Sequence, residues 1–65
     1  MADRPTFTAA EKRAEVQREI QMRRRAFPRW VSSGRIGQAT ADRRIAILEA
    51  IAEDYAERDL FGRVG

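Results

Sequence analysis

The 65-residue sequence contains no cysteine and no histidine. Without cysteine no disulfide can stabilise the fold, and without either residue type the usual ligand sets of zinc and haem sites are absent. A single core in a chain of this size supplies only about 3 to 5 kcal/mol of stability. We therefore expect one domain without metal or cofactor that gains stability by self-association.

Long apolar runs and catalytic groups are also lacking. No stretch approaches the roughly 20 apolar residues of a membrane span, and the start of the chain lacks the apolar run of a signal peptide. We therefore expect no membrane partner and a cytoplasmic location. A nucleophile would have to come from Ser32, Ser33, a threonine or Lys12, and no recognisable base accompanies them. The sequence indicates that the protein is not an enzyme and has no catalytic residues.

Arginine is plentiful. Twelve of the thirteen cations are arginine, eleven residues are alanine, and the net charge is +3. GC-rich genomes favour the codons of both residue types, so the excess of arginine is either functional or a mutational background. A net charge of this size is weak evidence for a nucleic-acid partner.

A capping box marks the start of the first helix. Thr8 and Glu11 have the spacing in which the threonine side chain and the glutamate each cap the other's backbone, which predicts a helix from Ala9 after a flexible arm over residues 1–8. An apolar seam with helical spacing, interrupted by one arginine, then follows at Val16, Ile20, Arg23, Phe27 and Trp30.

Pro28 interrupts the first helix. It lacks an amide hydrogen and its ring crowds the carbonyl of Arg24, so the helix either bends and continues to about Val31 or ends near Ala26. The bent helix is favoured because the seam continues through Trp30. Gly34 suits a left-handed helix cap.

A second helix is predicted from Gln38 to Leu60. Gly37 is the expected N-cap, Thr40 the alternative start, and Gly62 lies just past the expected end, which leaves a frayed tail over residues 62–65. On a helical wheel, one continuous apolar arc covers nearly half the circumference and comprises Ala41, Ile45, Ile47, Leu48, Ile51, Ala52 and Tyr55.

These elements predict an all-α fold, a two-helix antiparallel hairpin over residues 9–61. The apolar arc is wider than one partner helix covers, so we expect two chains to dimerise into a four-helix bundle. The residues expected in the core or in self-association are Val16, Ile20, Phe27, Ile45, Ile47, Leu48, Ile51 and Tyr55.

The two helices carry opposite charge. Residues 9–31 hold seven cations and three anions, a net charge of +4, whereas residues 38–60 hold three cations and six anions, a net charge of −3. Some arginines should therefore be paired within the fold, and Arg23 should extend its charged end to Glu19 or to an acid of the second helix.

The candidate binding surface is basic. Arg23, Arg24 and Arg25 point 100° apart and cannot all face one target. A better stripe is formed by Arg18, Arg25 and Arg29, flanked by Met22. It would suit an acidic, partly apolar protein surface or a phosphate backbone, or it is a solvated face paired with neighbouring glutamates. The full set of partner-binding candidates is Arg18, Met22, Arg24, Arg25, Arg29, Trp30 and Arg35.

Two other groups of residues have simpler interpretations. Phe27 and Trp30 are more typical of a packed seam than of a binding site. Glu49, Glu53 and Glu57 recur at every fourth position, as in carboxylate metal sites of helical bundles, but the histidines of such sites are missing. A solvated acidic face is the better interpretation of this row.

The chain resembles a family of small uncharacterised proteins encoded by tailed bacteriophages and prophages. The resemblance covers roughly residues 11 to 58 and lies in the segment Ile20 to Val31, in Gly34-Arg35, and in the segment Ala41 to Ile51. The family often has threonine at the cap of the second helix, where this chain has Gly37. The resemblance implies a phage setting, in which small proteins commonly bind and redirect or block host proteins, and it brings no assigned activity.

Three functions fit these observations. The leading hypothesis is a non-enzymatic, phage-type protein that binds and inhibits a host target such as a polymerase, a nuclease or a defence complex. The alternative is a basic nucleic-acid-binding accessory protein that uses Arg18, Arg24, Arg25, Arg29 and Arg35. The third is a structural or assembly component that associates mainly with itself.

Overall fold

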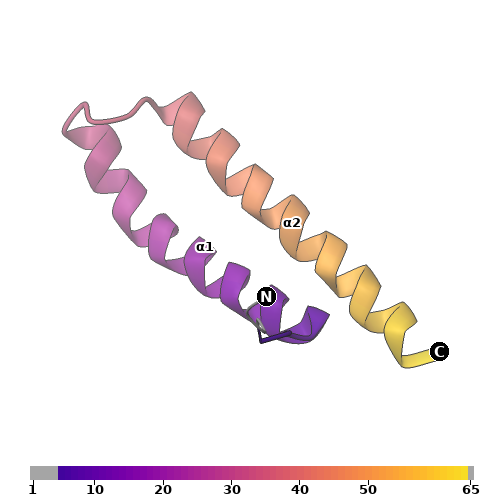
Figure 1. Cartoon of the computed structure of the whole chain (residues 1–65). Helices are drawn as coiled ribbons and strands as arrows, with labels where there is room; N and C mark the ends of the chain where they lie inside the picture. The colour runs from indigo at the N-terminus through magenta and orange to yellow at the C-terminus, as the bar shows by residue number, and fades with distance from the viewer. Residues whose placement is uncertain (1–4, 65) are drawn as a thin grey trace, which may run out of the picture.

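The protein is an antiparallel hairpin of two helices. The computed structural model describes the backbone of residues 5–64 and the side chains of residues 5–58. Helix α1 spans Ala9–Ser32 and helix α2 spans Gln38–Val64, and the two lie side by side (Figure 1). No strand occurs in the described backbone. The predicted all-α hairpin is confirmed, while residues 1–4 of the expected arm lie outside the described residues.

The capping box at the start of α1 forms as predicted. The backbone N–H of Glu11 donates to Oγ1 of Thr8 over 3.0 Å, and the N–H of Thr8 donates to Oε1 of Glu11 over 2.8 Å. Two of the N–H groups that a helix start leaves without a partner are thereby satisfied. These local contacts fix the first turn without help from α2.

Helix α1 continues through Pro28, so the alternative that ended it near Ala26 is wrong. The proline removes one backbone hydrogen bond, that to the carbonyl of Arg24. Its neighbours hold the helix in place: Phe27 is only 4% exposed, and its ring centre lies 5.5 Å from that of Trp30. Burial of the seam on both sides of the proline offsets the missing bond.

A Schellman motif ends α1. Gly34 adopts a positive φ of 79°, and its N–H donates to the carbonyl of Val31 over 3.1 Å. The N–H of Arg35 donates to the carbonyl of Trp30 over 2.8 Å. These two hydrogen bonds satisfy carbonyls in the last turn of the helix, and the chain turns back at this point. The left-handed cap at Gly34 is therefore confirmed.

Helix α2 begins where expected and ends later. The N–H of Ala41 donates to the carbonyl of Gly37 over 3.0 Å, so the helix starts at Gln38 and the alternative start at Thr40 is wrong. The expected end at Leu60 is also wrong, because the helix runs to Val64 and includes Gly62. A glycine within a helix costs only about 1 kcal/mol relative to alanine, and no proline stands between Gly62 and Val64. The expected frayed tail is therefore helical as far as Val64.

The buried core between the helices is small. Among the described side chains, the buried apolar residues are Ile20, Phe27, Ala41 and Ala52. The two alanines let α1 approach α2 closely. Of the other expected core residues, those that lie half-buried are Val16, Ile45, Leu48 and Tyr55.

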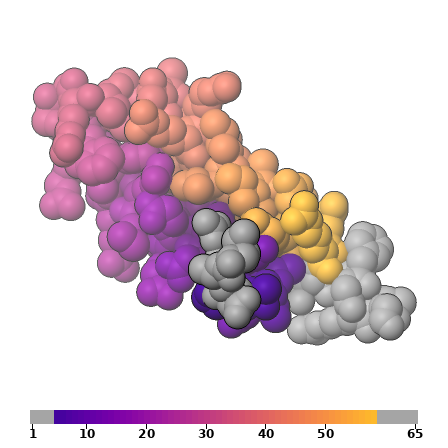
Figure 2. Space-filling model, viewed as in Figure 1, coloured from indigo at the N-terminus to yellow at the C-terminus, as the bar shows by residue number. Residues whose placement is uncertain are grey.

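Among the expected core residues, Ile47 and Ile51 are the most exposed. Their exposed fractions are 47% and 36%. The hairpin is one layer of two helices, 47 × 30 × 16 Å, and Figure 2 shows its elongated outline. Because a single neighbouring helix covers only part of the apolar arc, these two isoleucines face solvent in the single chain.

Candidate binding surfaces

The hairpin separates charge along its length. Residues 22–45, which form the turn and the helix ends beside it, hold seven arginines and one aspartate, a net charge of +6. The rest of the described side chains, in residues 5–21 and 46–58, hold four cations and seven anions, a net charge of −3. The fold thus has a basic turn end and an acidic open end.

The outward face of α1, defined by Arg18, Met22, Arg25 and Arg29, points away from α2. All four side chains are exposed, and Met22 is 55% exposed. Arg18 forms an ion pair with Glu15 at 3.0 Å, with about 70% of each side chain exposed. Such an exposed pair contributes little to stability. Within the described part of the chain, Arg25 and Arg29 form no ion pair.

The structure does not bring Trp30 and Arg35 into this face. Trp30 is half-buried against Phe27, and the guanidinium carbon of Arg35 lies 4.7 Å from the centre of its indole ring. These two predicted partner-binding residues contact each other at the end of α1. Their position favours a role in the turn, where Arg35 is exposed.

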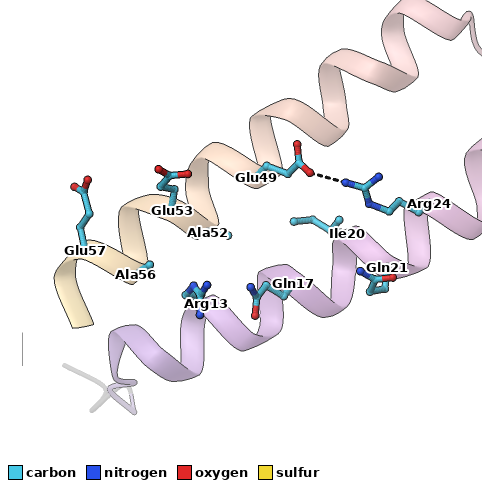
Figure 3. Close-up of a pocket in the computed structure, with 10 residues that line it drawn as sticks. All are labelled: Arg13, Gln17, Ile20, Gln21, Arg24, Glu49, Ala52, Glu53, Ala56 and Glu57. Carbon is cyan, nitrogen blue, oxygen red and sulfur yellow. Dashed lines mark hydrogen bonds and ion pairs between the residues drawn. The ribbon is translucent and has the colours of Figure 1, made fainter. Parts of the chain in front are cut away.

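Arg24 also lies apart from the outward face. It reaches across to α2, where its Nη2 atom lies 2.5 Å from Oε2 of Glu49 (Figure 3). Arg23 pairs with Glu19 on its own helix at 2.7 Å, as expected for an arginine whose stem packs in the seam. Both arginines are therefore engaged within the hairpin. The pair of Arg24 with Glu49 joins the two helices, as their opposite charges predicted, whereas the pair of Arg23 with Glu19 lies within α1.

A groove of about 740 Å³ runs along the side of the hairpin that carries the Arg24–Glu49 pair. In Figure 3 the carboxylates of Glu53 and Glu57 point away from α1. The Nε atom of Arg13 is buried in the groove wall without a hydrogen-bond partner. Among the described residues, no group of three carboxylates is placed to hold a metal ion.

Two contacts had no clear signal in the sequence. The ring of Tyr55 lies 5.7 Å from Nζ of Lys12 and 5.4 Å from the guanidinium carbon of Arg58, so cations from both helices flank one aromatic side chain. These distances are within the usual range of cation–π contacts. Only the antiparallel alignment of the helices places Lys12 opposite Tyr55.

Phe7 is a further exposed apolar residue. Its side chain is 58% exposed, just before the capping residue of α1. It lines a hollow of about 540 Å³ together with Glu11, Lys12, Ala14, Glu15 and Arg18. A hydrophobic residue at this position often packs on the first turn of the helix, which is the one sequence signal that could have singled it out.

No protein-family model, curated protein or solved structure matches this chain. Within the described residues, neither helix is both long and apolar enough to cross a membrane.

Proposed function

We propose that this chain is a small non-enzymatic binding protein of the phage type, which attaches to a host protein and inhibits it by covering its surface. The outward face of α1 is the contact surface. The observation that carries the proposal is the exposed side chain of Met22 next to Arg25 and Arg29, which form no ion pair within the described part of the chain. Apolar contact area beside free guanidinium groups fits an acidic, partly apolar protein surface.

A host polymerase, nuclease or defence complex would offer such a surface. Nucleic acid is the less favoured partner, because Trp30 has the Arg35 guanidinium stacked on its ring and Phe27 beside it. The indole is thus poorly placed to stack on a base, and Glu15 and the acidic open end would repel a long phosphate backbone.

The same proposal includes a dimer. The hairpin buries few apolar side chains and leaves Ile47 and Ile51 exposed on α2. A chain of this size gains stability by covering such residues with a second copy. Two hairpins would then form a four-helix bundle, and the outward face of each α1 would stay free for the host protein.

The test is affinity capture from host lysate, identification of the captured protein, and measurement of its binding to purified variants. We expect R25E combined with R29E to abolish binding while circular dichroism shows unchanged helicity. R43E is the matched control for the single variant R25E, because it changes charge equally on an exposed arginine of α2. Capture of nucleic acid alone, or equal loss of binding in R43E and R25E, would contradict the proposal.

A further inference from the structure

Ile47 and Ile51 form one exposed apolar step on α2. They are one helical turn apart and point to the same side of the helix. They lie about halfway between the turn and the last described side chain of α2. A second copy that covers this step can therefore lie along the whole length of the hairpin, either parallel or antiparallel to it.

Opposite charges flank the step at equal spacing. Arg44 lies three residues before Ile47, and Asp54 lies three residues after Ile51. At 100° per residue, these four side chains fall within a sector of about 80° on the surface of α2. Arg44 and Asp54 are exposed, and neither forms an ion pair within the described part of the chain. Basic and acidic ends of the step are thus both available to a partner.

The two orientations differ in which charges meet. In a parallel dimer Arg44 would lie at the level of Arg44 of the second copy, and the turn ends, each with a net charge of +6, would lie side by side. In an antiparallel dimer Arg44 would lie at the level of Asp54 of the second copy, and each basic turn end would lie beside an acidic open end. Like charges placed against each other disfavour an interface, and complementary charges fix its register.

We propose that a second copy of this chain packs antiparallel on the step of Ile47 and Ile51, with Arg44 of each copy paired to Asp54 of the other. The inference rests on the dimer of the proposed function and adds its contact residues and orientation. The symmetry is two-fold, so each pair occurs twice. Arg58 falls in the same sector one turn beyond Asp54, and its guanidinium carbon lies 5.4 Å from the centre of the Tyr55 ring, which Lys12 approaches from α1.

A charge-swap experiment tests the pairing. Each of R44D and D54R puts two like-charged contacts into the antiparallel dimer, so we expect the dimer dissociation constant from sedimentation equilibrium to rise about tenfold. The double variant R44D with D54R restores opposite charges, and its dissociation constant should return close to that of the original chain. R25D on the outward face of α1 and E53R on α2, which lies about 140° from the centre of the step on the helical wheel, are the charge-matched controls on exposed positions, and they should change dimerisation little.

A second measurement reports orientation directly. Because the chain has no cysteine, A39C carries a single spin label at an exposed position near the turn. Ala39 lies ten residues from the centre of the step, so two labels in the antiparallel dimer should be about 30 Å apart, at 1.5 Å per residue from each copy. In a parallel dimer the two labels would lie close together.

The outcomes distinguish failure of the dimer itself from failure of its antiparallel arrangement. A chain that sediments as a monomer at the highest attainable concentration overturns the dimer and the pairing with it. A dimer whose double variant is no tighter than the single variants, or whose labels lie close together, overturns the antiparallel arrangement and leaves the dimer standing. Rescue by the double variant together with distant labels supports the proposal.

Discussion

Arg35 and Trp30 contact each other twice at the end of α1. The backbone N–H of Arg35 donates to the carbonyl of Trp30 over 2.8 Å, and its guanidinium carbon lies 4.7 Å from the centre of the Trp30 ring. In a Schellman motif these two positions usually make an apolar contact. Here a cation on an aromatic face takes that role, so one residue pair closes the helix by backbone and side chain together.

Removal of the Arg35 side chain should therefore loosen the turn. We expect R35A to lower the free energy of unfolding by about 0.5 to 1 kcal/mol, the usual value of an exposed cation–π contact. Trp30 is the only tryptophan, so its fluorescence should report the change at that site. R43A, which removes another exposed arginine, serves as the control and should leave the emission unchanged. Identical emission spectra for R35A and the original chain would contradict the stacked arrangement.

Gly34 should resist substitution for a purely backbone reason. A Cβ atom at this position would meet no atom within 4 Å, but the φ of 79° is unfavourable for any residue with a side chain. We expect G34A to destabilise the hairpin by about 1 kcal/mol in chemical denaturation.

Gly37 provides the matched comparison for Gly34. It also has open space around its Cβ position, and its φ lies outside the left-handed region. G37A should change stability much less than G34A, and G37S should stabilise α2 by a few tenths of a kcal/mol or more by supplying a capping hydroxyl. Equal effects of G34A and G37A would show that the positive φ is not what constrains the turn.

Phe27 holds the centre of a small core. Truncation of a buried phenylalanine costs about 3 to 5 kcal/mol, which is comparable to the whole stability expected for a single core of this size. We expect F27A to lose most of its helical circular dichroism at 25 °C. F27L keeps most of the buried volume and should remain folded with a lower melting temperature. A fully helical F27A variant would mean that the seam contributes much less than its burial indicates.

Pro28 should be the least favourable residue of α1. Replacement by alanine restores the backbone hydrogen bond to the carbonyl of Arg24 and removes the steric crowding of the ring. We expect P28A to raise the free energy of unfolding by about 1 to 3 kcal/mol, measured by denaturant titration. P5A changes the same residue type outside the helix and should have little effect. Destabilisation by P28A would indicate that the proline sets a bend on which the packing depends.

The sequence predicted the local features well because neighbouring residues determine them. Thr8 and Glu11 set the start of α1, and Gly34 sets the turn, through contacts within a few residues of each other. The end of α2 was predicted less well, because Gly62 was interpreted as a stop although a glycine only weakens a helix.

The predicted partner-binding residues fall into two groups, those on the outward face of α1 and those that make contacts within the hairpin. Sequence spacing predicts only part of this division. Arg25 and Arg29 lie on the outward face of α1 as expected, while Arg24 and Arg35 make contacts within the hairpin. The partner of Arg24, Glu49, is 25 residues away in the chain. No spacing rule within one helix identifies such a pair, because it depends on how the two helices are aligned.

The sequence by itself determined two helices, the limits of the turn between them and an apolar arc on α2 too wide for one neighbour. These follow from hydrogen bonding and periodicity along the chain. Only the tertiary structure decided that Ala41 and Ala52 are buried while Ile47 and Ile51 stay exposed, and that charge divides into a basic turn end and an acidic open end. The physical reason is that the antiparallel alignment sets which residues meet across the hairpin, and the close approach of α1 at the alanines leaves the isoleucines to one side.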